Sequence, residues 1–97
     1  MLTGKQKSYL RSLAQTIKPI FQIGKEGLTE AVFASVDDYL LKNELMKVSL
    51  LDTCPMEKEE VVTLFSEHGN EVVQVIGKTI VLYHANKKLK EGIRLPR

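Results

Sequence analysis

The order of helix-like and strand-like patterns along this chain constrains its fold more than any other feature of the sequence. In three segments, apolar residues recur at three- and four-residue steps, which is the spacing of one helix face. Four short runs rich in strand-favouring residues lie between and after these segments. The order helix, strand, helix, strand, helix, strand, strand predicts an α/β fold: a two-layer sandwich with a mixed four-stranded sheet.

The predicted helices have recognisable boundaries. A residue suited to a helix start precedes each of the three apolar stripes. The three residues are Thr3, Thr29 and Pro55. Residues suited to helix ends follow the stripes, and these are Pro19, Asn43 and Gly69, with Asn43 expected in the left-handed conformation. Each helix therefore has a predicted beginning and end.

The predicted strands are residues 20–23, 45–51, 71–76 and 79–84. Gly77 and Lys78 separate the last two, and a two-residue link that begins with Gly predicts a tight primed hairpin turn. Crossovers between parallel strands are right-handed in about 98% of cases, so the linking helices should lie on the same face of the sheet. The opposite face is left for the first helix or for a ligand.

The length of 97 residues predicts one domain with one core. We expect this domain to span residues 1–84 and residues 85–97 to form a basic, loosely ordered tail. Cys54 is the only cysteine and has no internal partner for a disulfide, which fits a reducing compartment. No apolar run approaches the ~18 residues that span a bilayer. We therefore expect a cytoplasmic protein with no membrane association.

The net charge of +2 hides a segregation of charge along the chain. Residues 1–25 contain five bases and no acid, residues 26–77 contain eleven acids and three bases, and residues 78–97 contain six bases and one acid. The bases of the first segment are Lys5, Lys7, Arg11, Lys18 and Lys25. If the fold brings the two ends together, the chain gains a positive face suited to a polyanion. The alternative is that these charges only solvate the surface.

The loop from Gly24 to Gly27 joins a predicted strand to the start of a predicted helix. The unpaired amides and partial positive charge of a helix start favour a phosphate, and Lys25 adds a cation. The two glycines would let an RNA backbone approach closely, as in the GXXG loop of KH domains. Glu26 counts against such a site, and glycines at this position are also ordinary turn residues.

Signatures of catalysis or metal binding are weak. His68 and His84 lie in different elements, so we interpret them as a helix-end residue and a strand residue. Cys54 has no catalytic constellation around it and is interpreted as an ordinary small residue. We expect no enzyme activity, no metal, no cofactor and no small-molecule substrate.

Three tyrosines could stack on RNA bases. Tyr9 and Tyr39 fall on the apolar faces of helices, which favours core packing. For Tyr83 the strand and stacking interpretations both stay open, because its strand precedes the basic tail.

Three blocks of sequence together resemble the signatures of one family. They are residues 18–29 (KPIFQIGKEGLT), 43–48 (NELMKV) and 72–83 (VVQVIGKTIVLY). In this order and spacing they resemble the CRM-domain family, also called YhbY-like RNA-binding proteins. The similarity runs from about Thr3 to Tyr83.

The resemblance implies a stand-alone bacterial member with a single CRM-type RNA-binding domain, similar in fold to the C-terminal domain of translation initiation factor three. It implies binding to ribosomal RNA in precursors of the large ribosomal subunit. The family's GxxG loop corresponds to Gly24, Lys25, Glu26 and Gly27. Its basic RNA-facing surface would correspond to Lys5, Lys7, Arg11, Lys18, Lys47 and Lys78. The family often has a basic residue just after the last strand, where this chain has His84.

The main hypothesis is a non-catalytic RNA-binding protein that assists assembly of the large ribosomal subunit. The alternative is a protein-interaction module that reaches the ribosome through a ribosomal protein or assembly factor, with its acidic middle steering the partner. A continuous basic surface flanking the loop would favour RNA. An exposed apolar patch beside the acidic second helix would favour a protein partner.

Overall fold

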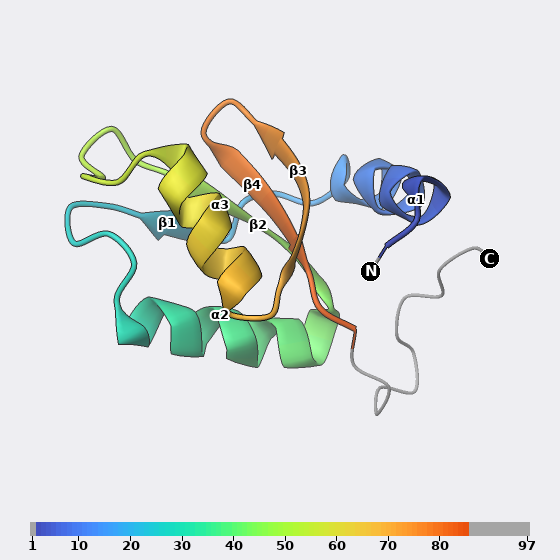
Figure 1. The fold of residues 1–97 in the computed structure, drawn as a ribbon, viewed down its shortest axis with the longest axis horizontal. Helices are drawn as coiled ribbons and strands as arrows, with labels where there is room; N and C mark the ends of the chain where they lie inside the picture. The colour runs from blue at the N-terminus through green and yellow to red at the C-terminus, as the bar shows by residue number, and fades with distance from the viewer. Residues whose placement is uncertain (1, 86–97) are drawn as a thin grey trace.

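The structure, a computed structural model, describes residues 2–85. The elements follow the predicted order (Figure 1). They are α1 (Gly4–Ala14), β1 (Phe21–Ile23), α2 (Glu30–Asn43), β2 (Leu45–Leu50), α3 (Lys58–Glu67), β3 (Glu71–Ile76) and β4 (Thr79–Tyr83). The predicted tail lies outside the described residues apart from Ala85.

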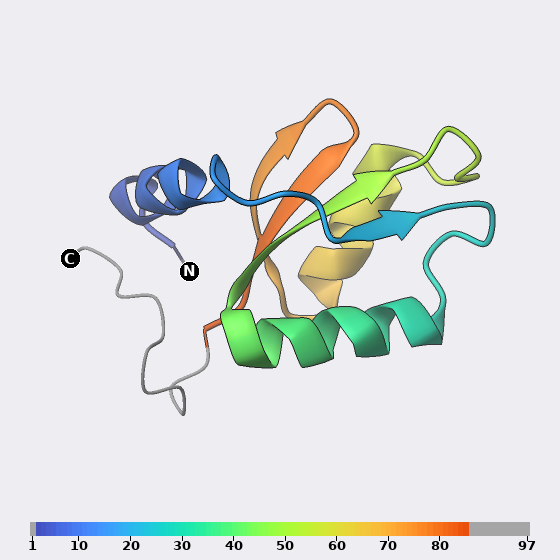
Figure 2. The same ribbon diagram turned by 180° about the vertical axis from the view of Figure 1, so that it is seen from behind.

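The four strands form one mixed sheet with the spatial order β1-β2-β4-β3. β1 and β2 are parallel, and β4 is antiparallel to both β2 and β3. The β3-β4 hairpin supplies the antiparallel pairing, while α2 and α3 connect strands that run in the same direction. Both helices pack on one face of the sheet, as the crossover rule predicted (Figures 1 and 2). The predicted fold class is confirmed.

The main core lies between the sheet and the two helices α2 and α3. Its buried members are Ile23, Val36, Leu40, Met46, Val48, Leu50, Val61, Phe65, Ile80 and Leu82. Phe33 of α2 and Phe65 of α3 meet edge to face, with ring centroids 5.6 Å apart. Burial of one large apolar side chain stabilises the fold by about 1.5–3 kcal/mol. With ten buried residues, this layer therefore contributes most of the free energy gained from packing.

A second, smaller apolar cluster attaches α1 to the opposite face of the sheet. Its buried members are Leu10, Ala14, Leu45, Val73, Val81 and Tyr83. Because side chains alternate along a strand, Leu45 of β2 points to α1 while Met46 points to the main core. The first helix thus occupies part of the face that the sequence left open.

Several predicted helix boundaries hold. Thr3 forms a capping box with Gln6, and the Thr29 hydroxyl accepts a hydrogen bond from the Val32 amide. At the end of α3, Gly69 has φ +104° and its amide bonds to the Ser66 carbonyl. These residues satisfy backbone groups that a helix end otherwise leaves unpaired.

Three boundaries differ from the prediction. The first helix ends at Ala14, well before Pro19, because the Thr16 amide and hydroxyl both bond to the Leu13 carbonyl in a tighter turn. The third helix starts at Lys58, so Pro55 lies in the preceding turn.

Asn43 does not take the left-handed conformation either. It is the last residue of α2, and its side-chain amide donates to the Tyr39 carbonyl. Glu44 takes the left-handed conformation instead, with φ +62°. The helix therefore ends one residue later than predicted.

The hairpin has the predicted turn. Gly77 has φ +56°, and Ile76 and Thr79 pair directly on either side of it. A bulge lies between Val72 and Gln74, where the register of β3 against β4 shifts. β4 ends at Tyr83, one residue before the predicted end of the strand. His84 is therefore not a strand residue, and its amide donates to the Glu44 carbonyl.

Candidate nucleic-acid interface

The three helices differ in charge. α1 contains Lys5, Lys7 and Arg11 and no acid, whereas α2 and α3 each contain three acids and one base. Lys5 and Arg11 are exposed and Lys7 is half-buried. α1, the helix with only positive charge, packs on the sheet face opposite the two acidic helices. The end of α1 comes near α2, where both helices line one groove.

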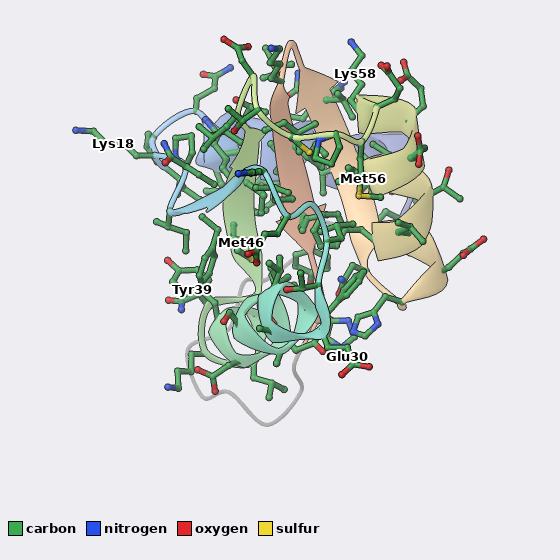
Figure 3. All side chains as sticks on the ribbon, turned by 90° about the vertical axis from the view of Figure 1, so that its left-hand side faces the viewer. Lys18, Glu30, Tyr39, Met46, Met56 and Lys58 are labelled. Carbon is green, nitrogen blue, oxygen red and sulfur yellow. The ribbon has the colours of Figure 1, made fainter. Side chains whose placement is uncertain are left out.

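Lys18 and Lys47 extend positive charge on the same side of the sheet. Lys18 is exposed in the segment before β1, and Figure 3 shows it projecting away from α3. Lys47 is half-buried on β2, and strand alternation places it on the same face as Leu45, which contacts α1. Lys18 thus lies between α1 and β1 along the chain, and Lys47 lies on the neighbouring strand β2.

The loop from Gly24 to Gly27 is a tight turn between β1 and α2. The Gly27 amide donates to the Gly24 carbonyl at 2.9 Å, and Lys25 and Glu26 are exposed at the corner. Gly27 is buried and has φ +69°, a conformation that a side chain rarely adopts. The turn geometry alone accounts for glycine at this position.

Both glycines also pack against the segment that follows β2. A Cβ at Gly27 would lie 3.0 Å from the Met56 Sδ, and a Cβ at Gly24 would lie 3.2 Å from Leu51 Cδ1. The Leu28 amide donates to the Met56 Sδ at 3.4 Å. The absence of a side chain at each glycine therefore makes room for Leu51 and Met56 of the same chain, not only for a ligand.

A phosphate at this loop would depend on Lys25 and on the first amides of α2, because the glycines face inward. Glu26 in the turn and Glu30 in the first turn of α2 both place negative charge at the same position. The loop combines a cation and helix-start amides with two nearby acids. The assignment of this loop to RNA contact stays a prediction.

Lys78 lies in the β3-β4 turn and forms an ion pair with Asp52, in the segment after β2. The hydrogen bond from Lys78, together with its positive charge, lowers the pKa of the Asp52 carboxyl. The Leu50 amide also donates to the Lys78 carbonyl at 2.8 Å. Lys78 thus already has an acidic partner.

The predicted contact residues form two groups. Figures 1 and 2 show α1 at one end of the long axis and the loop between β1 and α2 at the other. That axis measures 39 Å and the two shorter ones 24 Å each. Lys5, Lys7 and Arg11 belong to the α1 end, and the glycine turn with Lys25 belongs to the loop end.

The tyrosines fall into three environments. Tyr39 packs edge to face on Phe21, with ring centroids 6.3 Å apart, so core packing is confirmed. Tyr83 is 3% exposed, which excludes stacking on a base; burial, with the Glu44 carboxylate as a second cause, raises its pKa. Tyr9 is 38% exposed and belongs to neither apolar cluster, so the prediction of core packing was wrong.

The histidines and the cysteine have structural contacts. His68 follows α3, with its Nε2 2.8 Å from Asp37 Oδ2 and its ring 4.6 Å from that of Phe33. Cys54 is half-buried in the turn before α3. Within residues 2–85 there is no cluster of three or more His, Cys, Asp or Glu side chains able to hold a metal. The helices in this part of the chain are also too short or too polar to cross a membrane.

Comparison with known proteins places this fold among named relatives. The chain is 44% identical over 97 residues to "Probable RNA-binding protein YqeI" of Bacillus subtilis, covering 99% of this chain and all of the relative. It is 35% identical to an RNA-binding protein of Haemophilus influenzae, covering 99% of this chain and 96% of the relative. Neither name describes an enzyme.

A solved structure and a family profile agree with these relatives. The solution structure of the hypothetical protein SAV1595 from Staphylococcus aureus matches with a TM-score of 0.80 and 52% identity, over 99% of this chain and all of that one. A sequence profile of the CRS1 / YhbY (CRM) domain matches residues 2–84. This chain, with its basic α1, its mixed sheet and its glycine turn, belongs to the CRS1 / YhbY (CRM) domain family.

Proposed function

We propose that this protein binds RNA without catalysing a reaction. The observation that carries the proposal is the separation of charge by layer. α1 contains three bases and no acid and lies on one face of the sheet, while the acidic helices lie on the other. A polyanion would be attracted to the first face and repelled from the second. The names of the two relatives support the same ligand class.

The proposed contact surface begins at α1 and extends along the segment before β1. Lys5 and Arg11 are exposed on the helix, and Lys18 projects from the segment that follows. Lys47 lies on the same face of the sheet. Contacts of this type bind mostly through phosphates, so affinity should fall steeply with salt. The glycine turn with Lys25 would form a second contact at the far end.

For the target we propose ribosomal RNA in precursors of the large ribosomal subunit, with a role in their assembly in the cytoplasm. The support for this finer statement is the family resemblance. Ultraviolet crosslinking in cells, followed by sequencing of the attached RNA, tests it. Crosslinks concentrated in large-subunit ribosomal RNA are expected. Crosslinks spread over messenger RNA at their cellular abundance would refute the ribosomal target while leaving RNA binding intact.

The protein-interaction alternative has less support. The sequence criterion for it was an exposed apolar patch beside the acidic second helix. On α2, Leu41 is the one large apolar side chain that is strongly exposed, at 52%. A single exposed leucine is ordinary for a monomeric protein. Cosedimentation with large-subunit particles without any RNA crosslink would favour this alternative.

A further inference from the structure

Tyr9 is an aromatic side chain that the fold does not use. It lies on α1 and is 38% exposed, and neither apolar cluster includes it. Within residues 2–85, the structure shows no side-chain hydrogen bond and no ring contact for Tyr9. The other two tyrosines are packed, because Tyr39 meets Phe21 and Tyr83 is buried. A large planar side chain is therefore presented to solvent by a helix that is itself firmly attached.

The position of Tyr9 on α1 places it one helical turn from a cation and one turn from a residue that lines a groove. Lys5, Tyr9 and Leu13 are four residues apart and share one side of the helix, which we name the Tyr9 flank. Leu13 leads into an open groove of about 310 Å³ between the end of α1 and the C-terminal half of α2. The lining residues are Leu13, Thr16, Ile17, Tyr39, Asn43 and Leu45.

The chemistry of the Tyr9 flank, together with that of the groove that Leu13 lines, fits an unpaired nucleobase. Bases present an apolar face that stacks on an aromatic ring, and they carry polar edges that a hydroxyl or an amide can meet. The groove supplies both kinds of surface, with apolar walls and the polar side chains of Thr16 and Asn43. A phosphate next to the stacked base would meet Lys5, on a helix that contains no acid.

Resting on the RNA-binding function proposed above, we propose that the Tyr9 flank binds an unpaired base of single-stranded RNA, with the Tyr9 ring as the stacking platform. A base inside a duplex is already stacked on both faces and cannot occupy this position. The flank therefore gives the protein a preference for single-stranded over double-stranded RNA, which its positive charge alone does not provide.

The absence of tryptophan from the chain makes a direct test possible. A Tyr9→Trp variant has a single tryptophan, at the proposed platform, which can be excited selectively over the two remaining tyrosines. Its emission should be quenched when a 12-nucleotide single-stranded RNA of mixed sequence is added, and quenched far less by the same strand paired with its complement. Leu41→Trp is the matched control, because Leu41, 52% exposed against 38% for Tyr9, is at least as accessible and lies on the acidic helix α2. That variant should show no quenching with either RNA.

Affinity measurements separate stacking from charge. Tyr9→Ala should weaken binding of the single strand by about 5- to 150-fold, the range that one lost base stack corresponds to. Tyr9→Phe keeps the ring and should bind like the wild type. The salt slope should be the same in all three, because no charge is removed. Circular dichroism of Tyr9→Ala should match that of the wild type, because the side chain is outside both clusters.

The outcomes distinguish this inference from the broader function. If the wild type binds RNA but Tyr9→Ala binds single strands equally well, the platform is refuted and RNA binding stands. Equal losses for single-stranded and duplex RNA would also refute it, because stacking cannot act on a duplex. If the wild type binds neither RNA at any salt concentration, both proposals fail together.

Discussion

The α1 end and the loop end of this molecule carry the two groups of predicted RNA contacts, and they differ in what the fold requires of them. At the α1 end, Leu10 and Ala14 are buried and attach the helix, while Lys5 and Arg11 are exposed and outside both apolar clusters. At the loop end, Gly27 is needed by the turn and by its contact with Met56.

The difference bears on how function is assigned to residues. The glycine turn is the most recognisable motif of the sequence, yet backbone conformation and packing account for Gly27, and Gly24 packs closely against Leu51. The exposed residues of α1 belong to no motif, and neither apolar cluster includes the Tyr9 ring, which lies on a helix that contains three bases and no acid. The α1 end is therefore the stronger candidate for the primary RNA contact.

The largest expected effect concerns the attachment of α1. Leu10 is fully buried in the second cluster, so Leu10→Ala removes buried apolar area and leaves a cavity. We expect a loss of about 2–5 kcal/mol in the free energy of unfolding, measured by urea denaturation. Leu41→Ala is the matched control, because that leucine is 52% exposed and its loss should change stability little. Equal stabilities of the two variants would show that α1 is not held as described.

At the loop end, Gly27 is the residue that the fold requires. Gly27→Ala should lower the free energy of unfolding by about 1–3 kcal/mol, because alanine is strained at φ +69° and its Cβ would meet Met56. Gly77→Ala separates the two causes. Its φ of +56° is similar, but no atom lies within 4 Å of the added Cβ. If both variants lose the same stability, the contact with Met56 contributes nothing and only the turn requires glycine.

Most of the fold could be predicted from local sequence. Helix stripes, strand runs and the Gly77 turn depend on residues close to each other in the chain, and the crossover rule then leaves few topologies. The errors lie at helix ends. Glu44 adopts the left-handed conformation expected of Asn43, because Asn43 remains helical and uses its amide to bond the Tyr39 carbonyl.

The candidate site was less predictable because its contacts are distant in sequence. Met56 lies under the glycine turn and bonds to the Leu28 amide 28 positions earlier, and no spacing rule connects the two. The Lys78–Asp52 pair spans 26 positions in the same way. Tyr9 was misplaced for another reason. Its position fits an apolar stripe, but α1 buries only a narrow arc centred on Leu10 and Ala14.

The charges at the two ends should differ in their effect on RNA binding. Arg11→Gln should reduce affinity and lower the salt slope by about 0.7–0.9, the value for one lost phosphate contact. Lys25→Gln should act in the same direction but more weakly, because Glu26 and Glu30 already oppose a phosphate at the loop. Salt titrations of a fluorescently labelled RNA measure both.

Lys58→Gln removes the same charge from α3, on the opposite side of the sheet, and should leave the slope unchanged. A larger effect for Lys25 than for Arg11 would reverse the comparison and make the loop the primary contact. Lys25→Glu, which reverses the charge, should weaken binding further without unfolding the protein, because Lys25 is exposed.

The smallest expected effect concerns Lys78 and Asp52, which lie on the side of the molecule near the loop. Their ion pair holds the pKa of the Asp52 carboxyl below its ordinary range, through the hydrogen bond first and the charge second. A carboxyl whose pKa is lower in the folded state favours folding above its unfolded pKa, and this contribution is lost as the pH falls through the lowered value. Because both side chains are well exposed, the effect on stability should be slight.

An NMR titration of the Asp52 carboxyl is the sensitive measurement of this pair. In Lys78→Gln its pKa should return upward to the ordinary range, and at neutral pH the stability of that variant should be nearly that of the wild type. The same variant should weaken RNA binding less than Arg11→Gln, because Asp52 already offsets the charge of Lys78. An unchanged titration of Asp52 in Lys78→Gln would show that the pair does not persist in solution. Lys78 would then be available to bind a phosphate. The loop end would gain a second phosphate contact in addition to Lys25, comparable to the contacts proposed on α1.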